Sequence, residues 1–137
     1  QMIEALNLIQ DHLFVGIFPA LQEAGIAALL NPNSEEAVAQ LNATYDSRRD
    51  AFVQAAAKIG WQAFPSRGSF YAWMPVPEGY TSESFADLLL EKAHVAVAPG
   101  KGFGPAGDAY VRIGLLVEPE RLVEAVNRIA NLHLFNN

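Results

Sequence analysis

Residues 109–115 have the sequence Ala-Tyr-Val-Arg-Ile-Gly-Leu, in which aliphatic residues alternate with residues of other kinds. Side chains of a β-strand point alternately to its two faces. The alternation therefore predicts a strand that places Val111 and Ile113 on one face and Tyr110 and Arg112 on the other.

Arg112 is the first candidate for a functional role in this strand. A guanidinium beside Gly114, where another backbone can approach closely, suits the two-pronged recognition of a carboxylate. Surface arginine is the commoner case, however. From the alternation alone, an arginine on a solvated strand face is therefore the favoured interpretation of Arg112.

The segments around this strand predict an alternation of helices and further strands. Apolar residues at helical spacing mark the helices, and short apolar or aromatic runs mark the strands. Ser34 is expected to be the N-cap of a long helix and Gly60 its C-terminal cap. The order is two helices followed by α-β-β-α-β-β-α. Helices are expected at residues 2–14, 19–30, 34–59, 82–90 and 119–129, and strands at residues 61–64, 69–75, 94–98 and 109–115.

The break at Asn31-Pro32-Asn33 is expected to divide the chain into two parts, residues 1–33 and residues 34–137. The first part is helical and has no convincing core of its own. The second has about the smallest size at which a domain folds comfortably. Because Gln1 falls within a helical pattern and is not a methionine, we expect the chain to be a fragment of a longer protein.

Composition excludes several classes of function. The net charge is −6 and no basic cluster exceeds Arg48 and Arg49, so neither nucleic acid nor a membrane is an expected partner. The chain has no cysteine, and its three histidines are far apart, so no metal site is expected. No apolar run could span a bilayer and no signal peptide is visible, which favours a cytoplasmic protein.

Two other segments are candidate sites. Residues 98–105 read Ala-Pro-Gly-Lys-Gly-Phe-Gly-Pro, whose backbone N–H groups could meet an anion. The spacing fits neither a P-loop nor a dinucleotide fingerprint, so a tight connection is the simpler interpretation. Residues 68–73 read Gly-Ser-Phe-Tyr-Ala-Trp and could line a ligand pocket or pack into a core.

Together these three segments resemble the C-terminal region of class I/II pyridoxal-phosphate aminotransferases of fold type I. The resemblance covers essentially the whole chain, and residues 85–93 and 110–115 look closest to the branch that contains the diaminopimelate-type aminotransferases. Its matching residues are Pro65, Gly68, Phe70, Tyr71, Trp73, Pro99, Gly100, Phe103, Gly104, Tyr110, Val111, Arg112 and Ile113.

The resemblance implies an α/β (α+β sandwich) fold. Residues 34–137 would be the small C-terminal domain, a small mixed sheet covered by helices, and residues 1–33 the helical end of the large cofactor domain. The full enzyme would transfer an amino group from an amino acid to a 2-oxo acid, use pyridoxal phosphate and form a homodimer.

The resemblance also assigns substrate-binding residues. Arg112 would bind the α-carboxylate of the substrate, and Phe70 would line the substrate side of the pocket. Phe18 would lie in a turn that reaches toward a neighbouring subunit's substrate pocket, and the loop of Phe103 would lie near the pocket mouth. The family's cofactor-binding lysine and the Gly-x-Arg-x-Gly stretch after it have no counterpart in residues 1–137. We therefore expect no catalytic and no cofactor-binding residue here, and an inactive fragment.

Two other classes of function remain open from the residues themselves. Residues 34–137 could be a free-standing regulatory or small-molecule-binding domain in which Arg112 anchors a carboxylate. The chain could also be a structural interaction module served by its apolar first helices. Coding sequence upstream of Gln1 that contains the lysine and the Gly-x-Arg-x-Gly stretch would decide for the aminotransferase.

Overall fold

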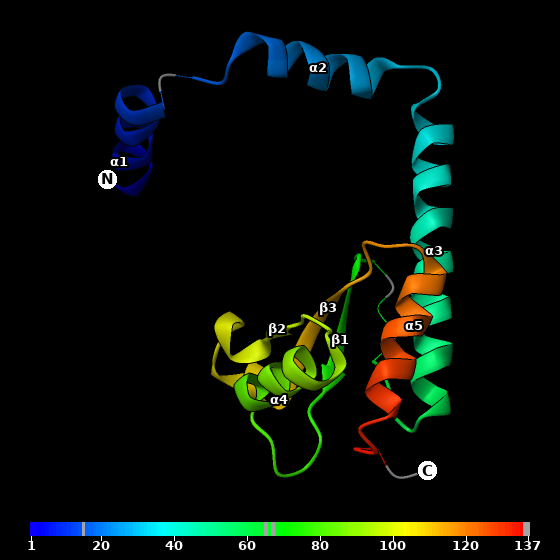
Figure 1. Ribbon diagram of the computed structural model, residues 1–137. Coiled ribbons are helices and arrows are strands. Elements are labelled where there is room, and N and C mark those ends of the chain that lie inside the picture. Colours follow the sequence, from blue (N-terminus) through cyan, green and yellow to red (C-terminus); the bar gives the residue numbers. More distant parts are fainter. Residues whose placement is uncertain (15, 65, 67, 136–137) are drawn as a thin grey trace. The chain divides into compact units, whose positions relative to one another are not determined.

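The computed structural model describes residues 1–14, 16–64, 66 and 68–135. Figure 1 shows the elements in chain order. By its internal contacts the chain forms two compact units, Gln1–Leu41 and Asn42–Asn137, which are described separately. Pro65, expected in the turn before the first aromatic strand, lies outside the described residues.

The first unit is helical. It contains α1 (Met2–Ile9), a π-helical turn (Gln10–Phe14), α2 (Pro19–Leu30) and the start of α3 (Ser34–Lys58). Pro19 opens α2 as predicted, because a helix start does not need its missing N–H. None of the described residues of α1 or α2 is buried.

Ser34 does not cap α3 as predicted. It is the first residue of the helix, and its single hydroxyl proton is shared between the carbonyl oxygens of Ala28 (2.5 Å) and Asn31 (2.7 Å). The hydroxyl thus satisfies carbonyls at the end of α2, where helical carbonyls lack partners, instead of an N–H of α3.

The prediction that Gly60 caps the long helix is confirmed. Gly60 has φ +81°, a left-handed conformation that costs glycine little. Its N–H donates to the carbonyl of Ala57, and the N–H of Trp61 donates to the carbonyl of Ala56. This pair of bonds is a Schellman motif, and it turns the chain back beneath α3.

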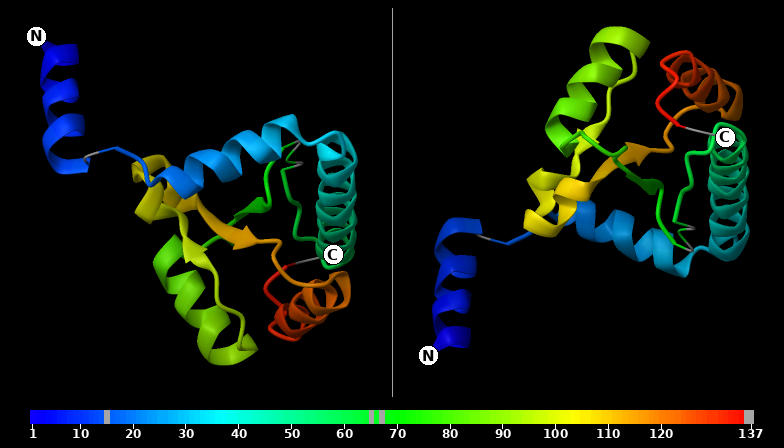
Figure 2. Two further views of the ribbon diagram at one scale, coloured as in Figure 1. Left: turned by 90° about the horizontal axis from the view of Figure 1, so that it is seen from above. Right: turned by 90° about the horizontal axis from the view of Figure 1, so that it is seen from below.

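The second unit contains a three-stranded sheet in the order β1-β3-β2, with β1 (Tyr71–Pro75), β2 (Ala98–Pro99) and β3 (Tyr110–Gly114). Both pairings are antiparallel, in contrast to the mixed sheet that was expected. A parallel relation exists only between β1 and β2, which flank β3 and do not pair. Two strands and α4 (Ser82–Leu88) therefore form a split β-α-β unit with β3 inserted between the strands (Figure 2).

Two strand predictions are wrong. Residues 61–64 form no strand, because Trp61 turns inward and its indole N–H donates to the carbonyl of Pro75 at 2.8 Å. Residues 94–97 form no strand either. His94 takes a left-handed conformation (φ +54°) that ends the π-helical turn Leu89–Ala93, so pairing begins only at Ala98.

One face of the sheet carries the core, and α3, α4 and α5 (Pro119–Ala130) cover it. Trp61 is 1% exposed and meets the rings of Phe52, Phe85 and Phe135. In both figures α5 runs beside the C-terminal half of α3. The sheet contributes Ala72, Met74, Val111 and Ile113 to this core. The alternation read from residues 109–115 is thus confirmed, and Arg112 lies on the opposite face.

Candidate functional site

Arg112 lies at the centre of the open sheet face. It occupies the middle of β3, opposite Trp73 of β1 and Ala98 of β2. Because β3 is the central strand, both neighbours restrict where the arginine side chain can lie. The sheet therefore holds this cation at a defined place on the face opposite the core.

Two aromatic rings enclose the guanidinium of Arg112. Its Cζ lies 4.1 Å from the ring centroid of Tyr71 and 4.0 Å from that of Phe103. Contact with the negative faces of aromatic rings stabilises a cation and leaves its N–H donors uncommitted. Within the part of the chain that the structure describes, the Arg112 side chain makes no hydrogen bond or ion pair.

Every other arginine in the described ranges is paired with a carboxylate. Arg48 pairs with Glu118 at 2.6 Å, and Arg49 pairs with Asp46 and Asp50. Arg121 and Arg128 both pair with Glu124. Arg67 lies outside the described residues. Arg112 thus combines a fixed position with unused donors, which is the arrangement that a carboxylate ligand requires.

More aromatic rings extend the surface around Arg112. Trp73 meets Phe103 edge-on at 5.6 Å and Tyr110 at 6.2 Å, and Phe64 meets Tyr110 at 5.9 Å. The cation therefore lies in an apolar, ring-lined surface, where contact with a ligand would exclude much of the surrounding water.

Phe70, the second predicted site residue, lies one ring away from Arg112. Its ring is 4.6 Å from that of Tyr71 and 5.7 Å from that of Tyr45 on α3. Its carbonyl accepts from the N–H of Leu115 at 2.8 Å, which continues the pairing of β1 with β3. The structure thus brings Phe70 close to Arg112, and 41% of its surface remains exposed for a ligand.

Phe18, the third predicted site residue, belongs to the first unit. It precedes α2 as its N-terminal flanking residue and is 68% exposed. Its role at a neighbouring subunit's pocket stays a prediction.

The segment 98–109 forms a packed connection with no free backbone cradle. Two 3₁₀ turns, Gly100–Phe103 and Pro105–Ala109, fold against each other. A methyl group on Gly100 would lie 2.1 Å from the carbonyl oxygen of Gly107. The glycines therefore serve close backbone packing, and the segment's contribution to the site is the ring of Phe103.

A polar link at the start of α4 holds this segment, and no local sequence pattern indicated it. Asp108 Oδ1 accepts from the hydroxyl of Ser82 at 2.8 Å and from the N–H of Ser82 at 3.2 Å. The Ser82 hydroxyl hydrogen bond, then the Ser82 N–H and the charge of Lys101, hold the pKa of Asp108 below its ordinary value. Lys101 also pairs with Glu83 at 2.7 Å.

The described lysines are spread over separate parts of the second unit, so no cofactor-binding lysine can be assigned from their positions. The cofactor's aldehyde needs an available lysine amine. Lys101 is engaged by Glu83, and Lys58 and Lys92 lie on the last turn of α3 and on the π-helical turn after α4. Among the residues that the structure describes, no cluster of histidine, aspartate and glutamate could hold a metal ion, and no helix is long and apolar enough to cross a membrane.

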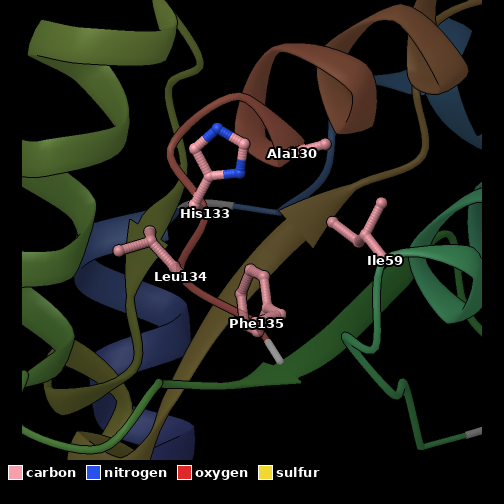
Figure 3. A pocket seen from close by; sticks show the side chains of 5 residues that line it. All are labelled: Ile59, Ala130, His133, Leu134 and Phe135. Carbon is pink, nitrogen blue, oxygen red and sulfur yellow. The ribbon is translucent and has the colours of Figure 1, made fainter. Parts of the chain in front are cut away.

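A pocket of about 200 Å³ lies elsewhere, at the C-terminal ends of α3 and α5 (Figure 3). Its side chains are apolar except for the imidazole of His133, and it contains none of the predicted site residues. The residues that line it are Ile59, Ala130, His133, Leu134 and Phe135.

Comparison with known proteins links this geometry to one family. The family described as aminotransferase class I and II matches residues 1–129. An L-glutamine–4-(methylsulfanyl)-2-oxobutanoate aminotransferase of Bacillus subtilis (strain 168) is 58% identical over 98% of this chain and 33% of its own length. An LL-diaminopimelate aminotransferase of Moorella thermoacetica is 44% identical over 93% of this chain and 32% of its own length.

A solved structure of apo-BacF from Bacillus subtilis superposes with a TM-score of 0.87 and 41% identity, over 98% of this chain and 35% of that one. The substrate-bound BacF structure gives a TM-score of 0.86 over 97% of this chain. The chain therefore spans about a third of the length of the relatives that it matches.

Proposed function

The chain belongs to the class I and II aminotransferase family, and from this premise we propose that it is the C-terminal part of an enzyme that transfers an amino group from an amino acid to a 2-oxo acid. The observation that carries the proposal is Arg112, the one described arginine that has no acidic partner, held between two rings on an open sheet face. Amino acids and 2-oxo acids share the carboxylate that such a group would bind.

The role of Arg112 is to bind and orient that α-carboxylate. A planar guanidinium that contacts rings still has N–H donors at its edge, so a carboxylate can meet it in one plane through two N–H bonds. This would fix the substrate's Cα relative to the sheet, and fixed geometry is a large part of catalysis. Phe70 and Phe103 would shield the ion pair from water and so strengthen it.

Pyridoxal phosphate is the cofactor proposed for the full-length protein, where it stabilises negative charge at the substrate's Cα. The residues that hold it would lie outside residues 1–137. The proposal includes no single substrate. Two relatives that match this chain over similar shares of their length carry different substrates in their names, L-glutamine with 4-(methylsulfanyl)-2-oxobutanoate in one and LL-diaminopimelate in the other. A homodimer in the cytoplasm, with Phe18 beside the partner's pocket, completes the proposal.

Substitution of Arg112 in the full-length protein tests the proposal. Arg112→Lys keeps the charge and loses the two-pronged bond, at a cost of a few kcal/mol. We expect kcat/KM to fall by about two orders of magnitude while cofactor binding stays nearly unchanged. Arg121→Lys, at an exposed arginine of α5, is the matched control and should behave as the unmodified enzyme. A normal kcat/KM in Arg112→Lys would refute the proposed role.

The isolated chain of residues 1–137 should be inactive. Residues 1–137 contain no counterpart of the family's cofactor-binding lysine. We therefore expect the chain's transamination with pyridoxal phosphate, an amino acid and 2-oxoglutarate to equal that of the free cofactor. Turnover above this background, or a cofactor absorption band that survives dialysis, would contradict this expectation.

A further inference from the structure

The ring of Phe103 reaches Arg112 from a segment that has no strand pairing of its own. Phe103 ends the first 3₁₀ turn, is 51% exposed, and touches the sheet through Arg112 and the edge of Trp73. An exposed ring on a short turn would ordinarily sample several orientations. Something must therefore hold the turn if Phe103 is to stay against the guanidinium.

Ser82 is a buried polar residue that ties this turn to α4. It is 0% exposed, and its hydroxyl lies between the two ends of the segment. It accepts from the N–H of Lys101 at 3.3 Å and donates to Asp108 Oδ1 at 2.8 Å. Both 3₁₀ turns are thus fastened to one hydroxyl, and buried polar groups that are satisfied in this way restrict the backbone strongly.

The close contact of Gly100 with Gly107 makes the two turns a single body. Because backbone touches backbone there, a shift of Asp108 cannot be absorbed between the turns and is passed on toward Phe103. The salt bridge of Lys101 with Glu83 joins the same segment to α4, but both of its side chains are more than half exposed. Such a pair adds little rigidity.

We propose that Ser82 and Asp108 are positioning residues for the substrate carboxylate, which hold Phe103 against Arg112 so that the guanidinium keeps one orientation. This inference rests on the proposed role of Arg112 in binding that carboxylate. Ser82 and Asp108 touch neither substrate nor cofactor, and they act through Phe103.

Nuclear magnetic resonance of the complete 137-residue chain can test the link without any enzymatic activity. Protons above an aromatic ring resonate upfield, so the Nε–H proton of Arg112 reports the position of Phe103. Phe103→Ala gives the shift expected when the ring is absent. Methyl signals of Val111 and Val126, both fully buried, report whether each variant keeps the fold.

The informative variants are Asp108→Ala, which removes the acceptor of both Ser82 bonds, and Asp108→Asn, whose amide oxygen can still accept them. We expect Asp108→Ala to move the Arg112 signal most of the way toward that of Phe103→Ala, and Asp108→Asn to restore it. Glu83→Gln, which breaks only the exposed salt bridge, is the control and should leave the signal in place. In a Phe103→Ala background, Asp108→Ala should have no further effect.

Titration with sodium pyruvate, the salt of a 2-oxo acid, at constant ionic strength tests whether the position of Phe103 affects carboxylate binding by Arg112. Asp108→Ala should weaken the pyruvate-dependent shift of Arg112 about fivefold, the effect of losing one hydrogen bond. If the unmodified chain shows no pyruvate-dependent shift, the proposed carboxylate role of Arg112 fails. The role of Asp108 in positioning Phe103 is then decided by the Arg112 signal of the variants without pyruvate. An Arg112 signal that is unchanged in Asp108→Ala, with the valine methyls in place, would overturn the inference.

Discussion

At the scale of single residues, what distinguishes Arg112 is the contrast with Arg48. Both guanidinium groups lie near aromatic rings, and the Cζ of Arg48 is 5.5 Å from the ring of Tyr45. Arg48 is joined to Glu118, however, so its charge is neutralised within the protein. Arg112 contacts two aromatic rings and has no acidic partner among the described residues. Rings stabilise the cation without consuming its donors, which keeps the donors available for an external anion.

Asp108 should make the stability of the chain depend on pH. Its pKa is lower in the folded protein, because Ser82 hydrogen-bonds the charged form, than the ordinary value of about 3.9 expected after unfolding. The unfolded chain therefore binds the proton more readily. The contribution of Asp108 is fully present above roughly pH 4 and is lost as the pH falls through the folded pKa.

Urea unfolding between about pH 6 and about pH 2.5 can measure this dependence. In Asp108→Asn the stability should fall less steeply on acidification than in the unmodified chain. Asp87→Asn, which changes an exposed carboxylate of α4, should keep the original slope. Equal slopes for the Asp108 variant and the unmodified chain would contradict the prediction.

At the scale of elements, several helix ends could be predicted, although the cap expected at Ser34 was wrong, and two of the four expected strands were wrong as well. The residues that mark these helix ends affect only the turn in which they lie: Pro19, Gly60, Thr81 and Pro119. The Thr81 side chain, for example, accepts from the N–H of Ser84 in a capping box. Residues 61–64 carry the apolar signal of a strand. Their true position depends on Trp61, which meets Pro75 and Phe135 from later parts of the chain, so the tertiary context overrides the local pattern.

The candidate site shows the same division. The strand face of Arg112 could be predicted from the alternation of residues 109–115. The ring of Phe103 and the link from Ser82 to Asp108 could not, because Ser82 and Asp108 are 26 residues apart in the chain and no local spacing relates them. The family resemblance indicated the loop of Phe103 near the pocket, but it gave no reason for the loop's position.

The connection between β2 and β3 should tolerate a methyl group at one glycine and not at another. At Gly100 the added carbon would lie 2.1 Å from the carbonyl oxygen of Gly107 and 2.4 Å from that of Tyr110, both backbone atoms. Gly100→Ala should therefore lower the free energy of unfolding by about 3 kcal/mol or more. Gly102 has no atom within 4 Å of such a carbon, so Gly102→Ala should change it by less than about 0.5 kcal/mol. Urea unfolding of both variants measures this, and equal stabilities would show that the two turns separate easily.

At the scale of the whole molecule, the two units differ in how they bury apolar surface. The described core residues run from Phe52 to Ile129, all within the unit Asn42–Asn137. In the first unit, α2 has Gln22 and Glu23 as its only polar side chains, and a helix that is apolar on all sides is normally covered by other protein. A helix of this kind needs other protein to cover it. The domain boundary expected at residues 31–34 stays a prediction.

The residues before Asn31 should therefore cause the chain to associate with itself. Leu29 is 84% exposed and Leu30 is 77% exposed, and apolar patches of this kind mark interfaces. Light scattering over a range of concentrations should show association of residues 1–137 and a monomer for residues 34–137. Leu29→Ser with Leu30→Ser should weaken the association, whereas Leu90→Ser, at a leucine of the second unit that is 54% exposed, should not. If the complete chain stays monomeric while residues 1–33 resist proteolysis, these helices pack on their own chain, and both the boundary and their role in a dimer are wrong.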